Sequence, residues 1–216
     1  MKKLDIIYED KHIIVVNKKS GVLTIATNKR EINTLYEEVK TYEKKKYPKN
    51  KIFIVHRLDK DTSGVIVFAK SEEVKFKLQN NWDNVCKARK YQAIVCGKPK
   101  KEQDTLVDYL LETKTYQTYI SKDNSGKKAI TKYNIIRSNR QYSFLDIEIL
   151  TGRRNQIRAQ LANIGCPIIG DKKFDAKSNP LRRLGLHASE LDLVHPVTNQ
   201  ILELKAKTPS NFEKVI

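Results

Sequence analysis

Short runs of branched and aromatic apolar residues, each bounded by polar or turn-forming residues, constrain the fold of this 216-residue chain most. Runs of this length and composition are typical of β-strands. In one of them apolar and polar residues alternate, as on a half-buried strand. The runs cover residues 4–8, 12–17, 65–69, 91–95, 142–150, 184–187 and 201–206. The first two suit a hairpin, and Lys18-Lys19-Ser20-Gly21 after them reads as a turn. Because few segments have helical spacing, we expect an α+β fold, a mixed and largely antiparallel central sheet with a few flanking helices.

Three helices are expected from capping and periodicity. Thr34 and Glu37 form a capping box at the start of the first helix, and Ser71 is a suitable cap for the second. The third is expected to follow residue 152, where Arg154 and Arg158 would share one face.

The composition, 39% hydrophobic and 31% charged, is that of a globular chain, and no apolar run is long enough to span a membrane. We expect one domain over residues 1–216 and, because acidic residues interrupt the first apolar run, a cytoplasmic location without a signal peptide. The three cysteines, Cys86, Cys96 and Cys166, are isolated and form no zinc-binding pattern. No metal site is therefore predicted.

Lysine and arginine exceed the acidic residues, giving a net charge of +17. Such a charge attracts polyanions, although a lysine-rich solvated surface would produce the same count. Lysines at the end of the first expected helix raise the same question, because they stabilise the helix dipole and could also contact phosphate. Charge alone leaves both interpretations open.

Residues 55–64 concentrate polar chemistry just before a buried strand. They include His56, Arg57, Asp59, Asp61 and Thr62. Polar groups gathered at a strand edge indicate a functional site. A turn in which the short polar side chains bond to their own backbone is the alternative that the residues themselves leave open.

The segment His56-Arg57-Leu58-Asp59 followed by Thr62-Ser63-Gly64 resembles the signature HRLDxxTSG of the RluA-type pseudouridine synthases. Residues 89–97 resemble the family's KxYxAxVxG strand, and residues 151–158 resemble its TGRxHQIR motif. Weaker similarities extend along the chain at Asn17-Lys18 with Gly21, Gly170-Asp171, Leu186-His187-Ala188 and His195-Pro196. The resemblance therefore covers nearly the whole chain.

This resemblance implies an enzyme that isomerises uridine to pseudouridine in ribosomal or transfer RNA. Asp59 would be the catalytic carboxylate, Tyr91 the aromatic residue that stacks on the target base, and Arg158 the partner of the aspartate. Arg57 would enter the space left when the uridine flips out of the stack. Taken without the resemblance, the position favours Tyr91 as a core aromatic residue of a strand. The isomerisation adds and removes no atoms, so no cofactor is expected.

Further RNA contacts are expected from the residues around these motifs. They are His56, Thr62, Arg153, Arg154, Asn155, Lys127 and Lys128. Two positions depart from the family pattern, because Asn155 stands where histidine is common and Phe174 where tyrosine is common. The resemblance favours a monomer. Because the sequence begins directly with the first expected strands, we expect no separate N-terminal RNA-binding module of the kind that some family members carry.

Two other functions fit the sequence less well. A noncatalytic RNA-binding protein would use the positive charge alone, but it would not need Asp59, Tyr91 and Arg158 together. An RNA methyltransferase would need a glycine-rich loop after an early strand, and the 8 glycines are not arranged in that way.

Overall fold

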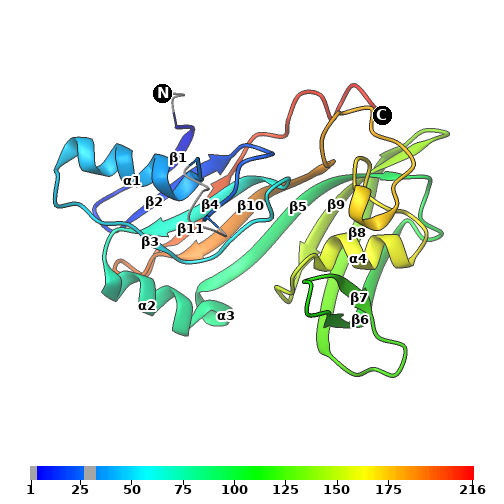
Figure 1. The fold of residues 1–216 in the computed structure, drawn as a ribbon, viewed down its shortest axis with the longest axis horizontal. Helices are drawn as coiled ribbons and strands as arrows, with labels where there is room; N and C mark the ends of the chain where they lie inside the picture. Colours follow the sequence, from blue (N-terminus) through cyan, green and yellow to red (C-terminus); the bar gives the residue numbers. More distant parts are fainter. Residues whose placement is uncertain (1–3, 27–32) are drawn as a thin grey trace. The chain divides into compact units, whose positions relative to one another are not determined.

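The computed structural model describes residues 4–26 and 33–216 (Figure 1). The chain forms two compact units. Unit 1 comprises Met1–Ala88 and Ala188–Lys207, and unit 2 comprises Arg89–His187 and Thr208–Ile216. No helix in the described ranges has the length and apolar character needed to cross a bilayer.

The strands in chain order are β1 (Ile6–Glu9), β2 (Ile13–Lys18), β3 (Phe53–Ile54), β4 (Ser63–Ala69), β5 (Cys86–Cys96), β6 (Gln103–Glu112), β7 (Thr118–Ile120), β8 (Lys127–Ser138), β9 (Tyr142–Ile149), β10 (Leu186–Val194) and β11 (Ile201–Lys205). The helices are α1 (Leu35–Lys46), α2 (Glu72–Asn80), α3 (Trp82–Val85), α4 (Gln156–Asn163) and the 3₁₀ turn η1 (Lys172–Phe174). The expected mixed α+β fold with mostly antiparallel strand pairing is confirmed.

The sheet of unit 1 has the strand order β1-β2-β4-β10, with β3 paired to β4 and β11 paired to β10. The expected N-terminal hairpin is confirmed, because β1 and β2 pair antiparallel. Every residue of β4 is buried. Val15, Val67 and Leu193 from three of the strands pack in one core cluster with Val74 and Leu78 of α2. Burial of these apolar side chains is the main stabilising term for the unit.

Both predicted helix caps of unit 1 are present. The Thr34 side chain accepts a hydrogen bond from the Glu37 amide at 3.3 Å, at the start of α1. The Ser71 side chain accepts one from the Val74 amide at 3.2 Å, at the start of α2. Each cap satisfies a backbone donor that the helix itself leaves unpaired.

An ion-pair cluster attaches the end of α1 to β1. Lys46 contacts Glu9 and lies 3.0 Å from Glu43, while Lys70 lies 2.5 Å from Glu9 and 3.1 Å from Glu43. Burial by itself would raise the pKa of Glu9, but hydrogen bonds from Lys46, Lys70 and Tyr42 outweigh it and lower that pKa to about 2. At least one lysine at the end of α1 is thus engaged within the protein.

Unit 2 contains the antiparallel strand order β5-β9-β8-β6-β7. Its main core joins Leu145 and Ile147 of β9 to Leu161 of α4 and to Ile168. The fully buried Gln160 of α4 accepts a hydrogen bond from the Thr131 hydroxyl at 2.7 Å, so α4 is fixed to β8 by a polar contact as well. Strands β6, β7 and β8 had no counterpart in the sequence prediction.

Two local expectations were wrong. Arg154 does not lie on α4, because Asn155 adopts the left-handed conformation with φ of 50° and the helix begins only at Gln156. Lys18 was assigned to a turn, but it is the last residue of β2 and is fully buried. In both places tertiary contacts, described below, override the local pattern.

Candidate active site

The signature residues from His56 to Thr62 lie on the loop between β3 and β4, and Ser63 and Gly64 begin β4. Leu58 and Thr62 are buried, Asp59 is partly buried and Arg57 is exposed. The buried side chains of Leu58 and Thr62 therefore pack the loop against the rest of unit 1. Its carboxylate and its guanidinium remain accessible, which a group that acts on a substrate requires.

Thr24 fixes the backbone of this loop next to Asp59. Its hydroxyl donates to the Leu58 carbonyl at 2.9 Å, and the Leu58 amide approaches the same hydroxyl at 3.4 Å. Thr24 is 3% exposed, so water does not compete with these bonds. Both backbone polar groups of the residue that precedes Asp59 are thus held by one side chain.

Lys18 fixes the other side of Asp59. Its ammonium group donates to the carbonyls of Val22 at 2.7 Å, Lys60 at 2.8 Å and Lys19 at 3.1 Å. The Lys60 carbonyl also accepts from the Gly21 amide at 3.0 Å. A buried ammonium group is costly unless its protons are hydrogen-bonded, and here three carbonyls supply that compensation.

Two more contacts complete the support of the loop. The Ser20 hydroxyl donates to the Asp61 carbonyl at 2.6 Å. The His56 ring accepts from the Val67 amide of β4 at 3.2 Å and lies 5.1 Å from the Trp82 ring. His56 is thus placed to orient the loop.

Gly64 of the signature permits a close backbone approach in unit 1. Its φ is 118°, and a Cβ atom there would lie 2.0 Å from the Ala188 carbonyl oxygen. Only glycine fits such a position, since any side chain would collide with backbone. The glycine of the signature therefore has a packing explanation.

Tyr91 of unit 2 lies on β5, where it pairs with Ile147 of β9. It is partly buried and packs against the main core cluster of the unit. Both interpretations of the residue fit this position, because one part of the ring contacts the core and another is accessible.

Arg158 of α4 is held by a second carboxylate. Its guanidinium donates to the two oxygens of Asp171 at 2.7 and 2.8 Å, and to the side-chain oxygen of Asn155 at 2.9 Å. Asp171 is 1% exposed. Two parallel charge-assisted bonds fix the plane of the guanidinium, which a lysine in its place would not reproduce. Asp59 belongs to unit 1 and Arg158 to unit 2, so their expected pairing stays a prediction.

Asn155, at the position where histidine is common in the family, makes two side-chain hydrogen bonds. Its amide nitrogen donates to the Thr118 hydroxyl of β7 at 3.2 Å, while its oxygen receives the bond from Arg158. Asparagine tolerates the left-handed backbone at this position better than most residues. It therefore links the start of α4, β7 and the arginine.

The remaining RNA-binding candidates of unit 2 are exposed cations. Arg153 donates to the Lys128 carbonyl at 3.0 Å, so its guanidinium is placed against the start of β8. Arg154 lies in the turn before α4, and Lys127 begins β8. These side chains place positive charge around the strand start and the turn.

Four supporting residues were not predicted as site residues: Lys18, Ser20, Thr24 and Asp171. A signal existed for two of them, since Lys18 and Asp171 stand in weaker family similarities at residues 17–21 and 170–171. Thr24 and Ser20 carry no local pattern that distinguishes them from ordinary turn residues. Their role depends on a contact with a loop far along the chain.

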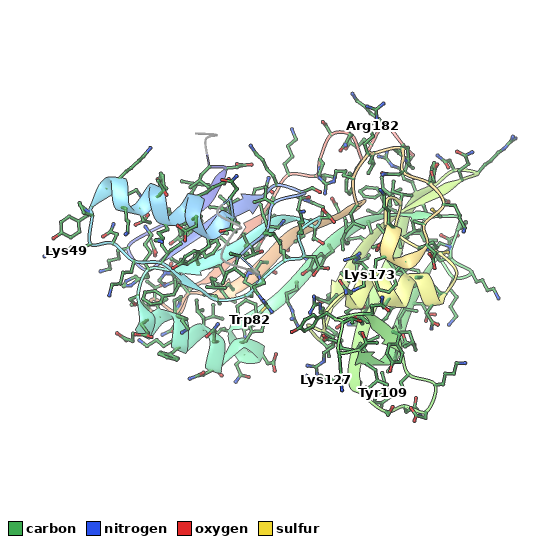
Figure 2. The ribbon with its side chains drawn as sticks, viewed as in Figure 1. Lys49, Trp82, Tyr109, Lys127, Lys173 and Arg182 are labelled. Atoms are coloured by element: carbon green, nitrogen blue, oxygen red, sulfur yellow. The ribbon has the colours of Figure 1, made fainter. Side chains whose placement is uncertain are left out.

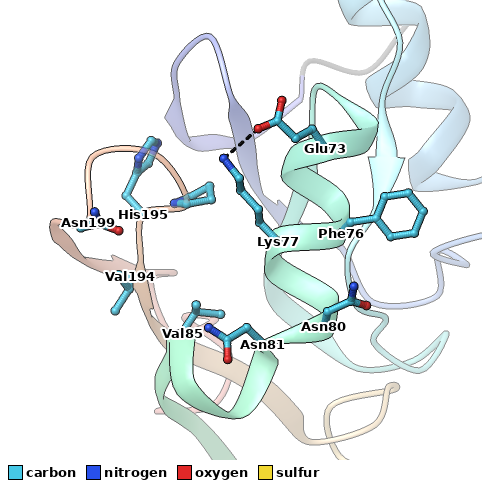
Figure 3. Close-up of a pocket in the computed structure, with 10 residues that line it drawn as sticks. Glu73, Phe76, Lys77, Asn80, Asn81, Val85, Val194, His195 and Asn199 are labelled. Carbon is cyan, nitrogen blue, oxygen red and sulfur yellow. Dashed lines mark ion pairs between the residues drawn. The ribbon is translucent and has the colours of Figure 1, made fainter.

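A cavity of about 530 Å³ in unit 1 is separate from these residues. Figure 3 shows it between α2 and the turn that follows β10, with the ion pair of Glu73 and Lys77 at one side. His195 lines it and lies 2.8 Å from the Asp10 carboxylate. None of the predicted site residues lines this cavity, and within the described residues no group of three metal-binding side chains is placed to hold an ion.

The fold matches solved structures titled as human proteins with an RNA pseudouridylate synthase domain. The protein titled domain containing 4 superimposes with a TM-score of 0.79 at 23% identity, over 97% of this chain and 90% of that chain. The one titled domain containing 1 gives a TM-score of 0.76 at 21% identity, over 96% and 84%. The fold is therefore that of an RNA pseudouridylate synthase domain.

Sequence comparison identifies the family. The family model described as RNA pseudouridylate synthase matches residues 12–163. An RNA pseudouridine synthase of Bacillus subtilis, YhcT, is 31% identical over 99% of this chain and 71% of its own length. Ribosomal large subunit pseudouridine synthases are 31% identical (D, Pasteurella multocida, 99% and 70% covered) and 34% identical (C, Rickettsia bellii, 97% and 70% covered). The chain belongs to the RNA pseudouridylate synthase family, whose members are isomerases that act on RNA.

Proposed function

We propose that this chain converts specific uridines of structured ribosomal or transfer RNA to pseudouridine, with Asp59 as the catalytic carboxylate. The bond between uracil nitrogen and ribose C1′ breaks, the ring turns, and uracil C5 bonds to the same ribose carbon while its proton is lost and nitrogen regains one. Reactant and product contain the same atoms at the same oxidation level, so the chain's own side chains suffice.

The observation that carries this proposal is the support of the Asp59 loop. Thr24 and Lys18, both buried, hold the backbone on the two sides of Asp59. A buried ammonium group is costly unless its protons are hydrogen-bonded, and the Lys60 carbonyl next to Asp59 is one of its three acceptors. Fixing a reacting carboxylate in place before substrate arrives is what efficient catalysis needs.

Asp59 would act in its ionised form, either as a nucleophile or as a base that removes a ribose proton. An arginine near a carboxylate favours that form. Arg158 is suited to this role because Asp171 and Asn155 already fix the plane of its guanidinium. We expect Arg158→Lys to lose most of the activity, because an ammonium group keeps the charge but not the planar fork.

The target uridine must leave its stack to reach a carboxylate, at a cost of a few kcal/mol. Arg57 is exposed on the same loop, two residues before Asp59, and we propose that it fills the space left by the base. The accessible part of the Tyr91 ring would stack on the flipped uracil while it is detached from the ribose.

The substrate class follows from two observations. The net charge of +17 suits a large polyanion, and relatives similar over nearly the whole chain are named for the ribosomal large subunit. Large-subunit ribosomal RNA is therefore the first substrate to test, with transfer RNA as the second.

The test is a map of pseudouridines in total RNA from a deletion strain, complemented with the wild type, Asp59→Ala or Asp61→Ala. Asp61 is the matched control, since it is a nearby exposed carboxylate on the same loop. One or a few sites should vanish on deletion and return with the wild type and with Asp61→Ala, but not with Asp59→Ala. Identical maps in all strains would overturn the proposal and favour a noncatalytic RNA-binding protein.

A further inference from the structure

A turn of unit 2, residues 113–117, holds an aromatic side chain in solvent. Backbone hydrogen bonds close the turn, from the Thr113 amide to the Gln117 carbonyl and from the Tyr116 amide to the Thr113 carbonyl, both at 2.9 Å. Tyr116 has φ of 61° and is 63% exposed. A bulky residue rarely adopts this left-handed conformation. Core packing does not explain an exposed aromatic residue in this conformation, and such backbone outliers cluster at functional sites.

Two cations contact this turn. The Arg154 guanidinium carbon lies 4.7 Å from the Tyr116 ring centroid, which is cation–π geometry. The Lys173 ammonium donates to the Tyr116 carbonyl at 2.9 Å and so connects the turn to η1. The backbone of Tyr116 is thus fixed by its own turn and by Lys173 of η1, and the Arg154 guanidinium lies beside its ring.

A cavity of about 570 Å³ is lined by residues that adjoin the turn, including Gln117, Tyr119 and Lys173. Tyr119 is 48% exposed and adds a second aromatic surface. Phe174 also lines the cavity, and the Arg158 guanidinium carbon lies 5.3 Å from its ring centroid. Within unit 2 the cavity therefore extends to Phe174, the side chain that contacts the predicted catalytic residue Arg158. Lys173 is labelled in Figure 2.

We propose that Tyr116 and Arg154 form a stacking platform for an unpaired nucleotide that flanks the target uridine in the RNA. Aromatic rings and guanidinium planes are the two protein surfaces on which unstacked bases pack, and here they lie together among exposed lysines such as Lys173. Stacking needs no particular base, so the platform would position the strand and leave the choice of uridine to other contacts. This inference rests on the proposed function, because it assigns a further part of the same substrate.

The test measures binding of two probes to the full chain by fluorescence anisotropy: a short single-stranded oligoadenylate and an abasic strand of equal length. Tyr116→Asn removes the ring, while asparagine tolerates the left-handed backbone. It should weaken oligoadenylate binding on the order of tenfold and the abasic strand less than about twofold, because only the former stacks. Tyr116→Phe should bind like the wild type.

Tyr47→Asn is the matched control, since Tyr47 is 53% exposed on unit 1 and should leave both probes unaffected. Wild-type affinity of Tyr116→Asn for oligoadenylate would overturn the platform, and so would an equal loss for both probes. The proposed function is tested separately by whether the wild type forms pseudouridine in RNA. If Tyr116→Asn binds oligoadenylate like the wild type while the wild type forms pseudouridine, only the platform is refuted. If the wild type forms no pseudouridine, only the proposed function is refuted.

Discussion

Lys18→Met tests whether a residue outside the chemistry sets the position of Asp59. Methionine keeps the length of the buried side chain and removes the three bonds that the ammonium donates at 2.7, 2.8 and 3.1 Å. A hydrogen bond to a charged group contributes about 1.5–3 kcal/mol, but methionine also avoids the cost of burying an ammonium group. The expected net loss of unfolding free energy is therefore about 3 kcal/mol, less than the sum of three bonds.

The effect on catalysis should be larger than the effect on binding. A reacting group displaced by about 1 Å can lose about a hundredfold in rate, and the Lys60 carbonyl next to Asp59 is one of the three acceptors. We expect kcat/KM for Lys18→Met to fall about a hundredfold, with RNA affinity within about twofold. Loss of tritium from RNA labelled at uridine C5 measures the rate, and urea unfolding measures the stability.

Lys19→Met is the control, because Lys19 is the exposed neighbour and the substitution removes the same charge. It should change the unfolding free energy by less than about 0.5 kcal/mol and leave the rate near that of the wild type. If Lys18→Met behaves like Lys19→Met in both assays, the idea that Lys18 positions the loop is refuted.

Three further predictions concern stability. Asp171→Asn should lower the unfolding free energy by about 3 kcal/mol, because it leaves the guanidinium of Arg158 without its buried counter-charge. Asp104→Asn, at the surface ion pair with Lys101, should leave the same urea titration nearly unchanged. Since the pKa of Glu9 is lowered from 4.5 to about 2, its contribution should be present above pH 4.5 and lost as the pH falls toward 2; Glu9→Gln should remove this part of the acid sensitivity, and an unchanged pH profile would contradict it. Gly64→Ala should cost more than about 3 kcal/mol or prevent folding, since its Cβ would meet the Ala188 carbonyl oxygen at 2.0 Å; near-wild-type thermal unfolding would show that the backbone can move apart.

Elements whose signals are local were predicted correctly from the sequence. The N-terminal hairpin, the buried strand β4 and the helices capped by Thr34 and Ser71 each carry their information within a few residues. Strand β8 was missed because its buried positions Ala129, Thr131 and Tyr133 alternate with mostly polar residues and include a threonine, so no apolar run marks it. Strand β6 does carry apolar residues over 106–111, interrupted by Asp108, and the sequence prediction did not assign them to a strand. Hydrogen bonds along the neighbouring strands, which the sequence does not display, stabilise them.

The candidate site divides in the same way. The acting residues Asp59, Tyr91 and Arg158 were named because short motifs surround them, and their roles stay predictions. The residues that hold them were not named as site residues. Thr24 and Lys18 hold the loop by hydrogen bonds to backbone carbonyls. Any residue type can supply a backbone carbonyl, so the partner position carries no sequence signal. No motif with a fixed spacing therefore marks these contacts.

The support of the Asp59 loop also sets the order in which the enzyme can become active. Thr24, Ser20 and Lys18 contact residues that follow them by 34, 41 and 42 positions, respectively. Closing such long loops is entropically costly and comes late unless the intervening chain has already folded. The Asp59 carboxylate should therefore reach its working position only after β2 and the segment from Lys19 to Thr24 have packed against the loop. A cut or deletion before residue 25 would then inactivate the enzyme while every residue expected to perform chemistry is still present.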